Sequence, residues 1–216
     1  MRTVFLILAV VLAAAAQSPT ARAEPASTTM KFAIMRDGDQ IGTSTFRVHR
    51  NGHDTTVEIA TQVEVKIAFI TMYRFEQTET EHWADGRLVS LNSVTDDNGT
   101  KHKVKATSRG DTLTIDADGN VTRTDASVMP VSLWNAAIVQ KTIALDPQDG
   151  KVVPLTVTDH GKERVVLQGR PETAHHYSLK TTFPQDVWYD DHQQLVKVAM
   201  RGSDGSTIEY EPGKES

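Results

Sequence analysis

Two glutamates, Glu79 and Glu81, have the residue type and spacing for acid–base chemistry. Residues two apart on a strand share one face of a sheet, so both carboxyl groups are buried if the alternation that places Phe75 inward continues. A buried carboxyl pair acquires proton affinities suited to acid–base catalysis, and with His82 or His102 it would indicate a hydrolase-type enzyme. Because burying unpaired carboxylates is costly, we expect both to face solvent. Cations that can pair with them there are Arg74, Lys101 and Lys103.

Eight histidines raise the question of a metal site. His175 and His176 are adjacent on a predicted strand and should point to opposite faces, which disfavours joint ligation. The stretch Asp190–His192 fits a solvated turn. Residues 116–120 resemble a calcium loop, but an EF-hand requires glycine at the sixth position and Gly119 falls at the fourth. We therefore expect no metal ion and no cofactor.

The absence of known motifs and the composition of the chain exclude several classes of protein. The sequence contains no nucleophile elbow, zinc-protease motif, phosphate-binding loop or dinucleotide fingerprint, which favours a non-enzymatic function. A net charge of −5 without a basic cluster argues against nucleic-acid binding. The chain has no cysteine, so disulfides and thiolate chemistry are excluded.

The elements that must position these groups are organised around the stretch 55–83. From Val57 to Val65 the odd positions are mostly apolar and the even positions mostly polar, which is typical of a strand with one buried face. As one straight strand the stretch would span on the order of 95 Å, so it must bend. We place the bend at residues 67–72, where apolar residues occupy both faces.

A sheet that curls around its apolar face forms a groove, and the bend would supply an apolar rim. Such a groove suits a hydrophobic, lipid-like ligand, because pockets for these ligands are mostly apolar. A protein-docking edge or a region buried on both sides explains the same residues. The candidate ligand contacts are Ile67, Phe69, Ile70, Met72, Tyr73, Trp83, Trp134 and Trp188.

Turn signals predict the architecture. Asp or Asn precedes Gly seven times, and this pair favours tight hairpin turns. Weaker turn signals occur at Arg109-Gly110, His160-Gly161 and Gln168-Gly169. Between the turns lie thirteen candidate strands, so the sequence predicts a mainly β protein. We expect an antiparallel meander curled into a barrel or half-barrel.

One short helix is predicted near residues 132–140. Ser132 is a candidate N-cap, and Leu133, Ala136, Ala137 and Gln140 follow at helical spacing. This helix would lie between the two halves of the meander and cover its open side. Trp134 would then either face the groove or serve as an ordinary core anchor.

The first 23 residues have the pattern of a secretory signal peptide. Arg2 precedes an apolar run of about 13 residues, and Ala21-Arg22-Ala23 provides a cleavage site. A retained membrane anchor is the alternative, although the run is shorter than the roughly 20 residues of a spanning helix. We expect residues 24–216 to form a single β-rich domain, periplasmic or secreted, without a lipidation site or a transmembrane segment.

Several motifs resemble an uncharacterised family of exported bacterial proteins, one of the domains of unknown function. They are Ile41-Gly42, Tyr73-Arg74-Phe75, the segment Glu81–Leu88, Ser132-Leu133-Trp134-Asn135, Asp186–Asp190 and Leu195-Val196-Lys197. The closing motifs are also distantly similar to a second such family. The resemblance covers nearly all of the chain after residue 23, and its architecture is similar to the half-barrels of periplasmic lipoprotein and lipid carriers.

These observations favour a periplasmic, non-enzymatic binding or carrier protein for a hydrophobic ligand. The alternatives are the hydrolase-type enzyme described above and a structural protein of envelope assembly. The expected partners are a hydrophobic small molecule or lipid, or an envelope protein, and not a nucleic acid. Architecture alone is a weak guide to function, because one fold serves many functions.

Overall fold

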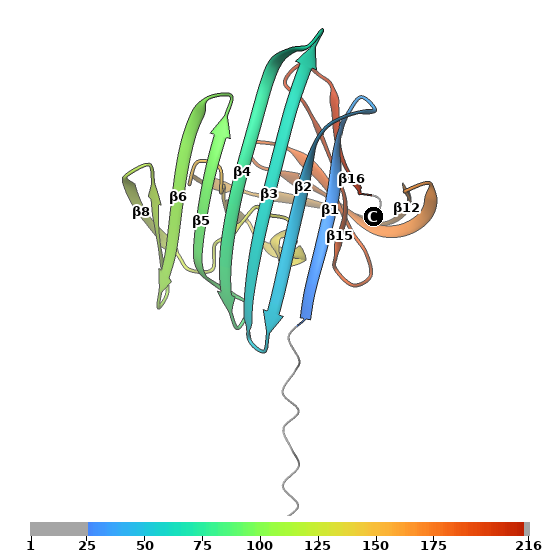
Figure 1. Cartoon of the computed structure of the whole chain (residues 1–216). Coiled ribbons are helices and arrows are strands. Elements are labelled where there is room, and N and C mark those ends of the chain that lie inside the picture. The colour runs from blue at the N-terminus through green and yellow to red at the C-terminus, as the bar shows by residue number, and fades with distance from the viewer. Residues whose placement is uncertain (1–25, 214–216) are drawn as a thin grey trace, which may run out of the picture.

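A 13-stranded antiparallel sheet dominates the structure, a computed structural model that describes residues 26–213 (Figure 1). The strand order is β12-β13-β14-β15-β16-β1-β2-β3-β4-β5-β6-β7-β8, so two meanders join where the first strand pairs with the last. The predicted signal peptide lies outside the described residues. The strands of the large sheet are β1 Ala26–Arg36, β2 Asp39–Asn51, β3 Asp54–Ile67, β4 Ile70–Ala84, β5 Arg87–Asp97, β6 Thr100–Arg109, β7 Thr112–Ala117, β8 Asn120–Asp125, β12 Thr156–Leu167, β13 Arg170–Lys180, β14 Gln185–Tyr189, β15 Leu195–Arg201 and β16 Thr207–Pro212.

Strand β3 shows why the sheet has one buried face. Its odd positions Val57, Ile59 and Thr61 are buried, whereas the even positions Glu58 and Gln62 are exposed. The same alternation continues across the register on β4 and β5. The prediction of a mainly β protein whose apolar side faces inward is therefore confirmed.

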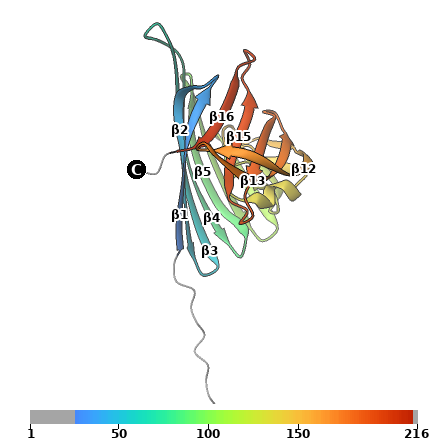
Figure 2. The same ribbon diagram turned by 90° about the vertical axis from the view of Figure 1, so that its right-hand side faces the viewer.

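Residues 126–155, yellow in Figure 2, connect the two meanders and contribute side chains to the core that both share. They contain a small three-stranded sheet formed by β9 Met129–Pro130, β10 Ile143–Leu145 and β11 Val152–Pro154. They also contain one 3-10 helix, η1 Ala136–Gln140, whose N-cap Asn135 accepts a hydrogen bond from the Ala137 N–H. The predicted helix is thus shorter than residues 132–140 and begins after Asn135 rather than Ser132, because Leu133 adopts a positive φ of 66° that cannot continue a right-handed helix.

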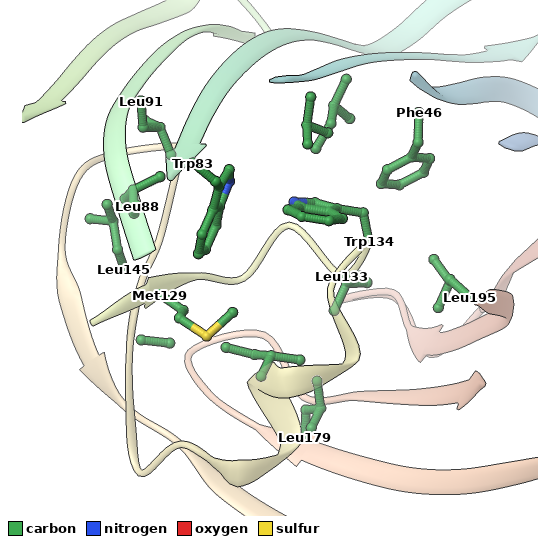
Figure 3. Close-up of a cluster of buried hydrophobic side chains, with 14 of the residues drawn as sticks. Phe46, Trp83, Leu88, Leu91, Met129, Leu133, Trp134, Leu145, Leu179 and Leu195 are labelled. Atoms are coloured by element: carbon green, nitrogen blue, oxygen red, sulfur yellow. The ribbon is translucent and has the colours of Figure 1, made fainter. Parts of the chain in front are cut away.

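One large hydrophobic core joins both meanders and the segment between them. Phe46 and Trp83 from the first meander, Leu133 and Trp134 from the connecting segment, and Leu195 from the second meander belong to it (Figure 3). A second, smaller cluster consists of Val165, Ala174 and Trp188. The connecting segment therefore fills the concave side of the sheet rather than roofing an open groove.

The sheet is curled but not closed. Within residues 26–213, β8 and β12 each pair with a neighbour on one side only, so both remain edges. Of the predicted barrel or half-barrel, the structure therefore supports the open, curved form. Across the same residues, no helix combines the length and apolarity needed to cross a bilayer.

One predicted turn is instead part of strand β12. His160-Gly161 was predicted as a turn between two strands, but β12 runs through it from Thr156 to Leu167. A β-bulge shifts the register between Asp159 and Gly161, and Gly161 has a φ of +79°. One type of bulge holds a glycine in the same left-handed conformation that a tight turn uses, so the glycine signal was real but its interpretation as a turn was wrong.

A second register shift, between Ile34 and Met35 of β1, lies opposite the segment from Gln40 to Gly42 in β2. Gly42 has no room for a side chain, because a Cβ atom there would lie 2.1 Å from the Gln62 carbonyl oxygen of β3. The motif Ile41-Gly42 therefore serves close packing of the backbone in this part of the sheet.

Candidate functional site

The tip of the β3–β4 hairpin carries the most exposed apolar side chain of the described protein. Phe69 is 100% exposed, Ile70 65% and Met72 56%; these three residues are called the hairpin tip below. The hairpin extends beyond the other strands of its meander, which is visible at the top of Figure 1. The predicted bend at residues 67–72 is thus a hairpin turn with Ala68 and Phe69 at its centre, and not a gradual curve.

The turn itself is made from unfavourable residues. Ala68 and Phe69 adopt φ values of 47° and 70°, a region that costs residues with a Cβ atom about 1 to 2 kcal/mol each. The turns at Asp37-Gly38, Asp85-Gly86 and Asn98-Gly99 adopt positive φ with glycine at the second position. Strain of this kind persists only where the rest of the structure imposes it and is frequent at functional sites.

Charged residues flank the hairpin tip in balanced pairs. Lys66 Nζ lies 2.6 Å from Glu64 Oε2, and the Arg74 guanidinium donates hydrogen bonds to Glu76. The hydrogen bonds from Lys66 and Thr71 lower the pKa of Glu64. The neighbourhood of the tip is therefore polar but has no strong excess of either charge.

The structure divides the eight predicted ligand contacts into separate groups. Phe69, Ile70 and Met72 form the exposed tip, and Ile67 is the last residue of β3, paired with Ile70. Tyr73 is half-buried, and burial together with a hydrogen bond to Asp97 raises its pKa.

The three tryptophans lie elsewhere. Trp83 and Trp134 are 4% and 8% exposed in the large core, where their rings pack edge to face 5.5 Å apart. Trp188 belongs to the smaller cluster. Contact of a ligand with Trp83 or Trp134 would therefore require the core to open.

Glu79 and Glu81 face inward, which corrects the expectation that they face solvent. Glu79 is 3% exposed and Glu81 is fully buried, because the inward register of Phe75 continues along β4. Burial of the Glu81 carboxylate is compensated by two charge-assisted hydrogen bonds. The indole N–H groups of Trp83 and Trp134 both donate to Glu81 Oε2, each at 2.6 Å (Figure 3 shows the two rings).

Glu79 lies beside Glu81 on the buried face of β4. Burial disfavours its charged form, and the adjacent charge of Glu81 adds to this, so the pKa of Glu79 lies well above its usual range. Oε1 of each carboxyl group lacks a hydrogen-bond partner among the described residues. The surrounding inner face is also partly polar, with buried hydroxyls at Ser44, Thr61, Ser93 and Thr95.

The histidines of the enzyme hypothesis do not converge on this acid pair. His82 is exposed on the opposite face of β4, where its Nδ1 lies 3.2 Å from Thr56 Oγ1. His102 on β6 pairs with Asp118 in the β7–β8 turn at 2.7 Å. Because catalytic groups must meet within hydrogen-bond reach of one reacting atom, this arrangement does not form the hydrolase site that the sequence left open. Sequence reasoning missed Trp134 as a partner of Glu81, because no local pattern links residues 53 positions apart.

Two hollows occur away from all of these residues. One of about 300 Å³ lies between the β12–β13 hairpin and the end of β16, and a second of about 150 Å³ adjoins it. Both are lined by Leu167, Gln168 and Pro212. None of the eight predicted ligand contacts lines either hollow.

Comparison with protein-family models identifies residues 32–213 as a match to the Domain of unknown function (DUF6134). The chain belongs to this family. The expected resemblance to an uncharacterised β-rich family is thereby confirmed. No curated protein sequence matches the chain.

The fold of this DUF6134 protein is similar to a solved structure, the β-barrel-like protein of domain of unknown function DUF1849 from Brucella abortus. The two share 12% sequence identity with a TM-score of 0.64 over 89% of this chain and 97% of that chain. At this identity the similarity concerns the fold alone.

Proposed function

We propose that this DUF6134 protein is a non-enzymatic binding protein of the bacterial envelope that attaches reversibly to a lipid surface through its hairpin tip. The observation that carries the proposal is the full exposure of Phe69 next to Ile70 and Met72. Exposed apolar residues are common singly, but adjacent ones on a projecting element indicate an interaction site.

The strained turn supports a role for this particular tip. An Asn-Gly turn would form the same hairpin without the conformational cost of Ala68 and Phe69. Phe69 makes up for none of that cost by packing, because its side chain is fully exposed. A binding role gives a reason for placing an aromatic side chain at this position.

The shape of the tip favours a lipid surface over an enclosed ligand. A convex projection cannot surround a small molecule, whereas a bilayer accepts apolar side chains without a complementary groove. Ion pairs at Lys66–Glu64 and Arg74–Glu76 would remain in the polar interface. Burial of a large apolar side chain contributes about 1.5 to 3 kcal/mol, so three of them support weak, reversible attachment.

Co-sedimentation with vesicles of phosphatidylethanolamine and phosphatidylglycerol tests this proposal. Residues 24–216 are expected to sediment with the vesicles, and the variant F69S/I70S/M72S is expected to lose at least tenfold in partition, which corresponds to about 1.4 kcal/mol. Attachment by apolar insertion should persist in high salt, because screening weakens only electrostatic adsorption.

A matched control replaces exposed apolar residues elsewhere. Val121 and Val166 are 57% and 70% exposed on the edge strands β8 and β12, and V121S/V166S should bind vesicles as the wild type does. The proposal is wrong if the wild type stays in the supernatant at every lipid concentration or if the triple variant binds equally well.

A further inference from the structure

A cluster of metal-ligating side chains lies on the second meander, apart from the hairpin tip and the buried acid pair. His160 on β12, His176 on β13 and Asp186 on β14 each present a ligand atom, and these three atoms lie within 4.8 Å of one another. His160 is exposed, whereas His176 and Asp186 are half-buried. The cluster is therefore accessible from solvent but rests on neighbouring strands of one sheet.

The bulge in β12 brings the cluster together. Gly161 pairs with His176, and His176 pairs with Trp188 on the next strand. His160 is the extra residue of the bulge, and its ring stacks on the ring of His176 with centroids 4.4 Å apart. In a regular strand the residue before Gly161 would point to the opposite face, so the cluster depends on the bulge.

The three ligand atoms already converge through hydrogen bonds. His176 Nε2 lies 3.0 Å from Asp186 Oδ1, and His160 Nε2 lies 2.8 Å from Ser178 Oγ. The Ser178 hydroxyl donates in turn to Asp186 Oδ1. Two imidazole nitrogens, one carboxylate oxygen and one hydroxyl thus meet in one place.

Neighbouring side chains fix the orientation of His176. Its ring lies between those of His160 and Trp188, the latter 4.3 Å away. Glu163 Oε1 accepts a hydrogen bond from Trp188 Nε1 at 2.6 Å and lies 3.4 Å from His176 Nδ1. A carboxylate beside the remote nitrogen of a histidine is the arrangement that holds metal-binding imidazoles in place, because it can accept the Nδ1 proton when Nε2 exchanges its hydrogen bond to Asp186 for a metal ion.

We propose that His160, His176 and Asp186 bind a zinc ion on the outer surface of β12–β14. Two imidazoles and a carboxylate form a ligand set that Zn²⁺ accepts, and a fourth position remains for the Ser178 hydroxyl or water. Tetrahedral bonds of about 2.0 to 2.2 Å require ligand atoms about 3.4 Å apart. His160 is exposed and therefore free to move the short distance that this contraction needs.

Isothermal titration with zinc chloride, on chelator-treated residues 24–216 without an affinity tag, tests the site. The wild type is expected to bind one Zn²⁺ per chain with a dissociation constant in the micromolar range or below. H160Q and D186N should each weaken binding by at least tenfold. The visible absorption of tetrahedral Co²⁺ in the wild type should be lost in H160Q.

A histidine elsewhere provides the matched control. His53 Nδ1 lies 3.0 Å from Asp85 Oδ1 in an exposed pair that resembles part of the cluster, and H53Q should leave zinc affinity unchanged. Circular dichroism checks that H160Q is folded, which is expected because His160 is exposed. Absence of stoichiometric zinc binding in the wild type, or unchanged affinity in both H160Q and D186N, overturns the proposal.

Discussion

At the scale of single residues, the buried pair Glu79 and Glu81 makes part of the protein interior polar. Glu81 accepts hydrogen bonds from two tryptophans that lie on different segments of the chain. Through Trp134 these hydrogen bonds link the connecting segment to β4, and an apolar residue in place of Glu81 could not accept them. Burial, together with the adjacent Glu81, raises the pKa of Glu79 well above its usual range. Removing either indole would leave a charged acceptor short of a donor inside the core.

The raised pKa of Glu79 makes stability depend on pH. A group whose pKa is higher in the folded state stabilises the protein fully below its unfolded pKa of 4.5, and this contribution is lost as pH rises toward the folded pKa. We predict that the stability of the wild type relative to E79Q falls by about 1.4 kcal/mol per pH unit as pH rises from the unfolded pKa of Glu79 toward its higher folded pKa. Urea unfolding of both proteins at several pH values measures this difference.

The comparison with E79Q isolates this group. Asp146, whose pKa burial also raises, titrates in both proteins. E58Q, at an exposed position of β3, is the control and should give a stability profile parallel to that of the wild type. A difference between the wild type and E79Q that does not change with pH would show that Glu79 is not the titrating group.

At the scale of elements, turns and bulges decide which side chains are presented. The β3–β4 turn exposes Phe69 by adopting positive φ at two residues with side chains. The β12 bulge adds one residue and thereby places His160 beside His176. Both features lie where the regular alternation of a strand is interrupted, and both candidate binding sites lie there too.

Replacing Ala68-Phe69 by Asn-Gly should separate stability from binding. We predict that A68N/F69G is more stable than the wild type by about 1 to 2 kcal/mol, because Asn and Gly adopt the turn conformation with little strain. The same variant should bind lipid vesicles more weakly. Urea unfolding and vesicle co-sedimentation measure the two effects.

Asp85, in the relaxed turn Asp85-Gly86, provides the reference. D85N should change the free energy of unfolding by no more than a few tenths of a kcal/mol, because both residues tolerate this region. Equal or lower stability of A68N/F69G would contradict the assignment of strain to the β3–β4 turn.

The sequence predicted the strands well because alternation is a local property. The inward register of Phe75 continues along β4 to Glu79 and Glu81, but general reasoning about the cost of buried charge assigned these two residues to the surface. For Glu81 that reasoning failed because the donors that compensate its burial, Trp83 and above all distant Trp134, are brought to it only by the fold. His160-Gly161 was ambiguous for a different reason, since a turn and a bulge use glycine in the same conformation.

At the scale of the whole molecule, the two meanders share one sheet and one large core. Strand β1 pairs with β16, and the large core contains residues from both meanders as well as from the segment between them. The smaller cluster around Trp188 belongs to the second meander alone. Because the core is shared, we expect residues 24–216 to unfold cooperatively as a single domain.

Cooperative unfolding can be tested with two probes. Trp83 and Trp134 report on the large core and Trp188 on the smaller cluster, while far-ultraviolet circular dichroism reports on the whole sheet. We predict that urea transitions followed by tryptophan fluorescence and by circular dichroism coincide. W188F removes the signal of the smaller cluster, and its fluorescence transition should still match its own circular dichroism transition. Separate midpoints would show that the two meanders unfold independently.

The open ends of the sheet carry a further consequence for how copies of the chain behave at high concentration. An unpaired strand edge is a template for association with another molecule. On β12 the bulge interrupts the ladder, and Asp159, Lys162, Glu163 and Arg164 place charges along the same strand. These features oppose edge-to-edge aggregation. Straightening this strand by deleting His160 would therefore remove a zinc ligand and also weaken the chain's protection against forming intermolecular sheets.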